Sequence, residues 1–143
     1  MLVCVNVSAQ YDPNKASAYE ALQRYEFPVG LLPEGVSGYS LNESSGEFWA
    51  HLNRSCSFTL ENSYELRYEP EIKGLLSKGR LEKLSGVSVK VVLVWLNIVQ
   101  VKRNRQSLHF SVGFKSADFP VENFEECPRC GCGFDCSSSS NYI

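Results

Sequence analysis

The stretch from Val87 to Val101 constrains the fold of this chain more than any other. It reads VSVKVVLVWLNIVQV and is the longest apolar run in the sequence. β-branched residues dominate it, and these favour a strand over a helix. Its odd positions are apolar except at Asn97, whereas its even positions are apolar only from Val92 to Ile98. The pattern predicts one central strand, buried along one face and covered over the middle of the other.

This predicted strand places Trp95 in the core, facing inward beside Leu93 and Val91. The apolar run is shorter than the roughly 20 residues that a helix needs to cross a bilayer. We therefore expect no transmembrane segment.

A short helix is expected ahead of the strands. Ser17 and Glu20 form a capping box, in which each side chain accepts a hydrogen bond from the other residue's backbone amide. Helical spacing of apolar residues follows over 18–25. Phe27-Pro28 ends the helix, because the residue before a proline avoids the α region. The helix is a candidate cover for the second face of the long strand.

Alternating segments separated by turn residues fill most of the chain. The expected strands are 35–41, 47–52, 56–60, 63–69, 71–77, 79–84, 87–101 and 107–114, with a turn at 102–105. About eight strands at this spacing predict an all-β fold, an antiparallel barrel or sandwich-like domain with one short N-terminal helix. Residues 11–126 form this single domain, 1–10 read as the remnant of a secretory leader, and 127–143 are a Cys/Ser-rich C-terminal tail.

The charge of the chain argues against nucleic acid as a partner. Its net charge is −2, whereas nucleic-acid binders are usually basic with a clustered patch. The basic segment 102–105 is typical of a solvated hairpin turn whose charges discourage aggregation of an apolar strand. Contact with anionic lipid head groups is the alternative.

The six cysteines indicate disulfides. Four of them fall within ten residues, too close together for a usual zinc site built from two separated ligand pairs. We expect no metal and no cofactor, and a tail stapled by disulfides, with a connection back to Cys56 as one arrangement; the pairing itself cannot be deduced. The disulfide candidates are Cys56, Cys127, Cys130, Cys132 and Cys136. If the leader is cut, Cys4 is removed and five cysteines remain.

The first ten residues resemble the end of a secretory leader, with Val7 and Ala9 as the small residues before a cut. The charged start and the apolar stretch of a full leader are incomplete. A secreted protein is expected if a full leader exists, and a cytoplasmic one if the N-terminus is as given. N-glycosylation triplets begin at Asn6, Asn42 and Asn53, of which Asn42 and Asn53 are the glycosylation candidates.

No catalytic residue is expected. His51 and His109 each lie in an alternating strand on the face opposite the apolar set, which is typical of surface histidines. The sequence has no G-x-S-x-G elbow and no glycine-rich phosphate loop. Glu65, Glu69 and Glu71 read as a solvated strand face.

Several blocks in combination resemble the plant family called domain of unknown function 538. They are 25–33 (YEFPVGLLP), 38–39, 46–48, 55–58, Gly74 with 77–79, 84–90, 110–113 and 119–124, within roughly residues 18–136. The resemblance implies a β-barrel-like domain with an N-terminal helix, frequent secretion, and a link to stress responses. It also implies a likeness to lipid-binding proteins of the bactericidal/permeability-increasing type, or alternatively a pigment-ester hydrolase activity.

We therefore expect a domain that binds a lipid or another small amphiphile without catalysis. The alternatives are an ester hydrolase and a structural or interaction domain with a filled core. An apolar pocket near Trp95 favours binding. A titratable residue with a strongly shifted pKa inside that pocket favours the enzyme. The candidate ligand-binding residues are Trp95, Leu93, Val94, Leu96, Tyr39 and Phe48.

Overall fold

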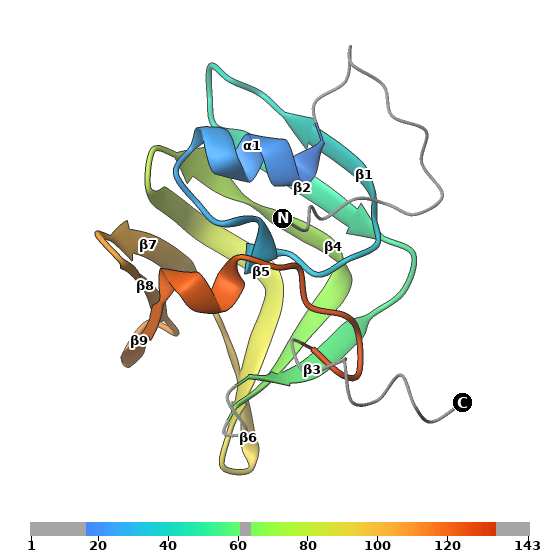
Figure 1. Cartoon of the computed structure of the whole chain (residues 1–143), viewed down its shortest axis with the longest axis vertical. Helices are drawn as coiled ribbons and strands as arrows, with labels where there is room; N and C mark the ends of the chain where they lie inside the picture. Colours follow the sequence, from blue (N-terminus) through green and yellow to red (C-terminus); the bar gives the residue numbers. More distant parts are fainter. Residues whose placement is uncertain (1–16, 61–63, 134–143) are drawn as a thin grey trace.

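The computed structural model describes residues 17–60 and 64–133, and these form an all-β domain with one short helix (Figure 1). The helix α1 is Ala18–Arg24, and two 3-10 helices are η1, Val29–Leu31, and η2, Val121–Phe124. The strands are β1 (Val36–Leu41), β2 (Glu47–Leu52), β3 (Cys56–Leu60), β4 (Tyr64–Ser77), β5 (Arg80–Val91), β6 (Val94–Asn97), β7 (Gln100–Asn104), β8 (Ser107–Ser111) and β9 (Ser116–Pro120). The predicted fold class is thus confirmed.

All of these strands join one antiparallel sheet that curls over on itself. The order is β1-β2-β4-β5-β7-β8-β9, with β3 paired to β4 and β6 paired to β5. The sheet does not close into a barrel, because β1 and β9 form its two ends. The curl brings Tyr64 at the start of β4 against Phe119 of β9, with ring centroids 5.7 Å apart. The result is a sandwich-like arrangement. Figure 1 shows α1, η1 and η2 lying across one face of it.

The helix begins at the predicted capping box. The Glu20 amide donates to Ser17 Oγ, and the Ser17 amide donates to the Glu20 carboxylate, each at 3.1 Å. The buried Tyr19 donates its hydroxyl to the Pro33 carbonyl at 2.8 Å and accepts from the Val36 amide at 3.2 Å. Burial raises the pKa of Tyr19 to about 12. These bonds fix α1 against the start of β1.

The core lies between the sheet and the segments that cross it. Leu22 of α1, Ile98 between β6 and β7, Leu108 of β8, and Phe124 of η2 are all fully buried. Tyr68 of β4 is buried with them and donates its hydroxyl to the Leu31 carbonyl at 2.7 Å. Burial raises the pKa of this phenol as well. The bond ties η1 directly to the central part of the sheet.

The prediction of one strand over 87–101 is wrong. β5 ends at Val91, the chain reverses at Val92-Leu93, and β6 returns antiparallel with Val91 opposite Val94. Another strand, β7, begins at Gln100. The reversal carries no glycine, asparagine or proline, although Val92 has a φ of 60°. The sequence therefore lacked the usual signal of a two-residue hairpin turn.

Other strand boundaries also differ from the prediction. β4 runs unbroken through Pro70, and β5 runs unbroken through Gly86, where separate strands were expected. Both irregularities are absorbed by register shifts between the two strands. β7 occupies part of the predicted turn at 102–105, and β9 was not predicted at all.

Candidate functional site

The curl of the sheet forms an apolar pocket of about 110 Å³ that is open to solvent on one side. Strands from three parts of the sheet form its walls. The lining residues are Leu60, Tyr64 and Leu66 from β3 and β4, Val89, Val91, Leu96 and Ile98 from β5, β6 and the segment after it, and Phe110, Val112, Lys115, Ser116, Ala117 and Phe119 from β8, β9 and their turn. Apart from the Tyr64 hydroxyl, the polar side chains that the described part of the chain contributes to this lining are Lys115 and Ser116.

Cross-strand pairing explains why the walls are apolar. Directly opposed residues of antiparallel strands share a face, and Val89 pairs with Leu96 in this way. On the opposite wall, Phe110 pairs with Ala117. The small alanine side chain beside the phenylalanine ring leaves space that a larger residue would fill.

Lys115 and Ser116 mark the mouth of the pocket. Both residues are exposed, in contrast to the deeper Phe119 and Leu66. An engineered cavity of about 150 Å³ is large enough for benzene. The pocket is smaller than that cavity, so only the end of a longer ligand would fit inside it and the rest would lie at the mouth.

A second cavity of about 20 Å³ lies deeper in the core, bordered by residues such as Leu22, Phe48 and Tyr68. It has room for about one water-sized sphere. This part of the core is therefore filled by side chains.

The structure separates the predicted ligand-binding residues into three places. Leu96 lines the pocket. Leu93, Val94 and Trp95 lie at the exposed end of the β5–β6 hairpin. The expectation that Trp95 faces inward is wrong, because Trp95 pairs with Lys90 on the outer face of the hairpin.

Tyr39 and Phe48 pack against each other across β1 and β2, with ring centroids 6.1 Å apart. Phe48 borders the small core cavity rather than the apolar pocket. Sequence reasoning missed Lys115 and Phe119. The alternation of Ala117 and Phe119 against Ser116 and Asp118 was the available signal for β9.

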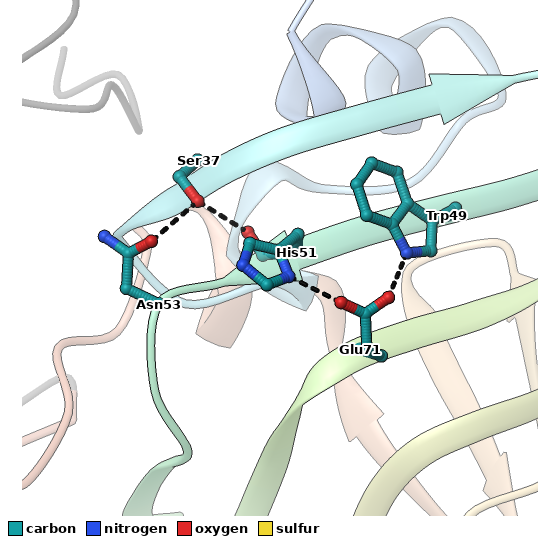
Figure 2. Close-up of polar contacts among 5 residues, drawn as sticks. All are labelled: Ser37, Trp49, His51, Asn53 and Glu71. Atoms are coloured by element: carbon teal, nitrogen blue, oxygen red, sulfur yellow. Dashed lines mark hydrogen bonds and ion pairs between the residues drawn. The ribbon is translucent and has the colours of Figure 1, made fainter.

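A polar cluster occupies the outer face of β1, β2 and β4 (Figure 2). The Glu71 carboxylate accepts a hydrogen bond from the Trp49 indole N–H, and its other oxygen lies 2.6 Å from His51 Nδ1. Both interactions lower the pKa of Glu71, the Trp49 bond most strongly. The Trp49 and His51 rings stack at 5.9 Å. Glu71 lies directly opposite His51 in the β2–β4 pairing, so strand register alone brings the pair together.

With Ser37, this cluster contains the serine, histidine and carboxylate of a catalytic triad, but the serine is not hydrogen-bonded to the histidine ring. Ser37 Oγ lies 3.1 Å from the Asn53 side-chain oxygen and 3.4 Å from the His51 carbonyl oxygen, rather than against the imidazole (Figure 2). A triad needs the base within reach of the nucleophile's hydroxyl. The cluster orients side chains on an exposed face, and it lines neither cavity.

The second histidine repeats the same cross-strand pattern. His109 Nδ1 lies 2.6 Å from Asp118, its direct partner across β8 and β9. Both histidines are partly exposed, each beside a carboxylate that the sequence did not indicate. Among the described residues, no group of three or more His, Cys, Asp or Glu side chains is placed to hold a metal ion.

A disulfide joins Cys56 of β3 to Cys130, which follows η2, with the two Cα atoms 5.0 Å apart. The Gly131 amide also donates to the Ser57 carbonyl at 2.7 Å, so residues after η2 lie along β3. Cys127 and Cys132 are disulfide-bonded as well. Cys136 and the leader remnant 1–10, including Cys4 and Asn6, lie outside the described residues.

The two glycosylation candidates are exposed. Asn42 caps its turn by accepting from the amides of Ser44 and Ser45, and Asn53 accepts from Ser37. No helix in the described part of the chain is long and apolar enough to cross a membrane.

Comparison with known proteins finds matches over most of the part of the chain that the structure describes. A family model described as "Protein of unknown function, DUF538" matches residues 18–125, from α1 through η2. The uncharacterized protein At5g01610 of Arabidopsis thaliana is 24% identical over 98 residues, which is 68% of this chain and 57% of that relative. The match thus spans less than two thirds of the relative's length.

Proposed function

The chain belongs to the DUF538 family, whose function is unknown, and we propose from its pocket that it is a non-catalytic binder of a single-chain amphiphile. The observation that carries the proposal is the apolar pocket of about 110 Å³ with Lys115 at its mouth. Enclosed apolar side chains take up an apolar group, and a few polar groups at the edge set its orientation.

The lining also limits the chemistry of the ligand. The inner wall offers carbon atoms almost throughout, so the inserted part is a hydrocarbon chain or ring. The exposed Lys115 ammonium favours an anionic head group outside the mouth. A fatty acid or a similar anionic amphiphile combines both features.

Ester hydrolysis is the weaker candidate because the pocket lacks the required groups. An acyl-transfer site needs an activated nucleophile or a bound metal. Among the residues that the structure describes, the lining offers the hydroxyls of Tyr64 and Ser116 and includes no histidine or carboxylate beside them. The groups whose pKa shifts through burial or hydrogen bonding, such as Tyr68 and Glu71, do not line this pocket.

A link to stress responses and export from the cell belong to the same proposal, and they follow from the family resemblance. The Cys56–Cys130 disulfide supports an oxidising compartment. The exposed Asn42 and Asn53 are available there as glycan acceptors.

The test is titration of the purified protein with a fluorescent fatty acid. Ala117→Leu places a larger side chain beside Phe110 and fills part of the pocket. We therefore expect it to weaken binding by about tenfold or more without lowering the melting temperature. Lys115→Glu repels an anionic head group and is expected to weaken binding less. Lys83→Glu makes the same charge change on an exposed residue that does not line the pocket, and it should leave binding unchanged.

Equal affinity of the wild type and Ala117→Leu would place the ligand elsewhere and overturn the assignment of the pocket. A parallel incubation with a fluorescent acyl ester, followed by chromatography, separates binding from catalysis. We expect the ester to return intact. Turnover above a heat-denatured sample would instead support the hydrolase.

A further inference from the structure

The end of the β5–β6 hairpin is an exposed apolar tip. Its residues Val92, Leu93, Val94 and Trp95 are 85, 82, 56 and 40% exposed, and Phe114 in the β8–β9 turn is 75% exposed. Figure 1 shows this hairpin projecting beyond the rest of the sheet at the lower end of the view. The β8–β9 turn borders the same pocket as the hairpin, because Val112 and Val91 both line it.

The turn itself is built from unfavourable residues. Val92 is the first central residue of a two-residue turn and has a φ of 60°, a position that favours glycine. A β-branched side chain is a poor fit to that backbone conformation. Backbone strain of this kind is found mostly at functional sites, where the identity of the side chain matters more than its fit to the backbone.

The same sheet shows that the turn geometry does not require apolar residues. The β7–β8 hairpin also reverses in two residues, Arg105 and Gln106, because Asn104 pairs with Ser107. Arg105 has a φ of 60°, as Val92 does. One hairpin thus carries polar residues at its end and the other carries Val and Leu in an equivalent position.

The charge around the tip is compatible with a phospholipid surface. Between Glu82 and Asp118 the sequence has six basic residues and no acidic one. Lys90 lies opposite Trp95, and Lys115 borders the pocket together with Val91. Glu65 of β4 faces Lys90 and partly offsets its charge. The other basic cluster, at 102–105, lies at the end of the β7–β8 hairpin, where Arg103 donates a hydrogen bond to the Glu26 backbone carbonyl.

We propose that this tip inserts into the interfacial region of a phospholipid bilayer. Val94 and Trp95 project to opposite faces of the hairpin, and Val92 and Leu93 form its end. A flat partner protein would cover only one face of the hairpin. Lipid surrounds both faces and the end of a hairpin that inserts into it. Tryptophan favours the membrane–water interface, and nearby lysines add attraction to anionic lipids. The inference stands on the tip alone and does not require a ligand in the pocket.

The experiment measures binding of the full chain to vesicles of phosphatidylcholine and to vesicles that also contain phosphatidylserine. Val92→Gly/Leu93→Asn replaces the tip by residues that suit the turn, so the hairpin keeps its shape and the melting temperature holds or rises. Vesicle binding should fall by about a hundredfold. Arg105→Gly/Gln106→Asn makes the equivalent change at the polar hairpin and should leave binding within about twofold of the wild type.

Trp95 supplies a second readout. In a Trp49→Phe background it is the remaining tryptophan, and its emission should shift to shorter wavelength when vesicles are added. Ala117→Leu should bind vesicles normally, so loss of the pocket and loss of the tip are distinguishable. The proposal is overturned if both turn variants bind vesicles equally. It is also overturned if the wild type binds none and instead forms dimers in sedimentation that Val92→Gly/Leu93→Asn abolishes.

Discussion

At the scale of single residues, Trp95 of β6 and Ile98, which follows β6, contribute very differently to stability. Ile98 is fully buried and borders both cavities, whereas Trp95 lies on the exposed face beside Lys90. Size and hydrophobicity alone would rank the tryptophan first. Its position on the hairpin reverses that order.

We expect Ile98→Ala to lower the free energy of unfolding by about 2–5 kcal/mol, because it leaves a cavity in the core. Trp95→Ala should cost less than about 1 kcal/mol, since surface substitutions have small effects. Urea denaturation of both variants checks the comparison. A larger loss of unfolding free energy for Trp95→Ala than for Ile98→Ala would contradict the placement of Trp95 on the exposed face of the β5–β6 hairpin.

The sequence predicted burial correctly where the strand was continuous and failed where it turned. Val87 is buried, as its odd position indicated. A two-residue turn pairs Val91 with Val94, so inward residues become even-numbered after it, and Leu96 and Ile98 face inward. Alternation alone cannot locate this change when the turn residues are themselves apolar.

At the scale of elements, β5 remains one strand because Gly86 allows it to bend. Gly86 has a φ of 95°, and a Cβ at this position would collide with the Glu71 carbonyl oxygen of β4. The β4–β5 register shifts between Tyr68 and Lys73, beside this close approach. Pro70 lies within the same irregular stretch, where its missing N–H is tolerated.

Gly86→Ala should therefore destabilise the protein by about 2–4 kcal/mol, through both backbone strain and collision. Gly113→Ala is the matched control. Its φ is 104°, but open space surrounds the position, so it reports the backbone cost alone, about 1 kcal/mol. Guanidinium denaturation measures both variants, and equal losses would show that the approach to Glu71 is unimportant.

The elements that sequence reasoning identified best were those with local signals. The capping box located α1 to within a residue of its end. The breaks expected near Pro70 and Gly86 were read from residues that usually end strands, yet pairing with a neighbour carried both strands through. The pocket could not be predicted, because it depends on the curl that brings β9 to β4.

At the scale of the whole molecule, the Cys56–Cys130 disulfide links segments 74 residues apart. Restricting a loop of this length in the unfolded chain contributes about 4 kcal/mol in the loop-entropy model. We expect Cys56→Ala/Cys130→Ala to lower the free energy of unfolding by about that amount. Denaturant titration of this variant and the wild type tests it, and a loss below about 1 kcal/mol would show that the other contacts along β3 already hold the segment.

The concave face of the sheet is closed by segments from both ends of the described chain. Phe124 of η2 packs on Phe110 at 5.7 Å, and η2 rests against Gly30 of η1, where any side chain would collide with the Phe124 carbonyl. During synthesis from the N-terminus, the part of this face that η2 covers therefore stays open until residues 121–124 have left the ribosome. The nascent chain passes through a stage with a nearly finished sheet and an open apolar surface, which is when a chaperone would engage it.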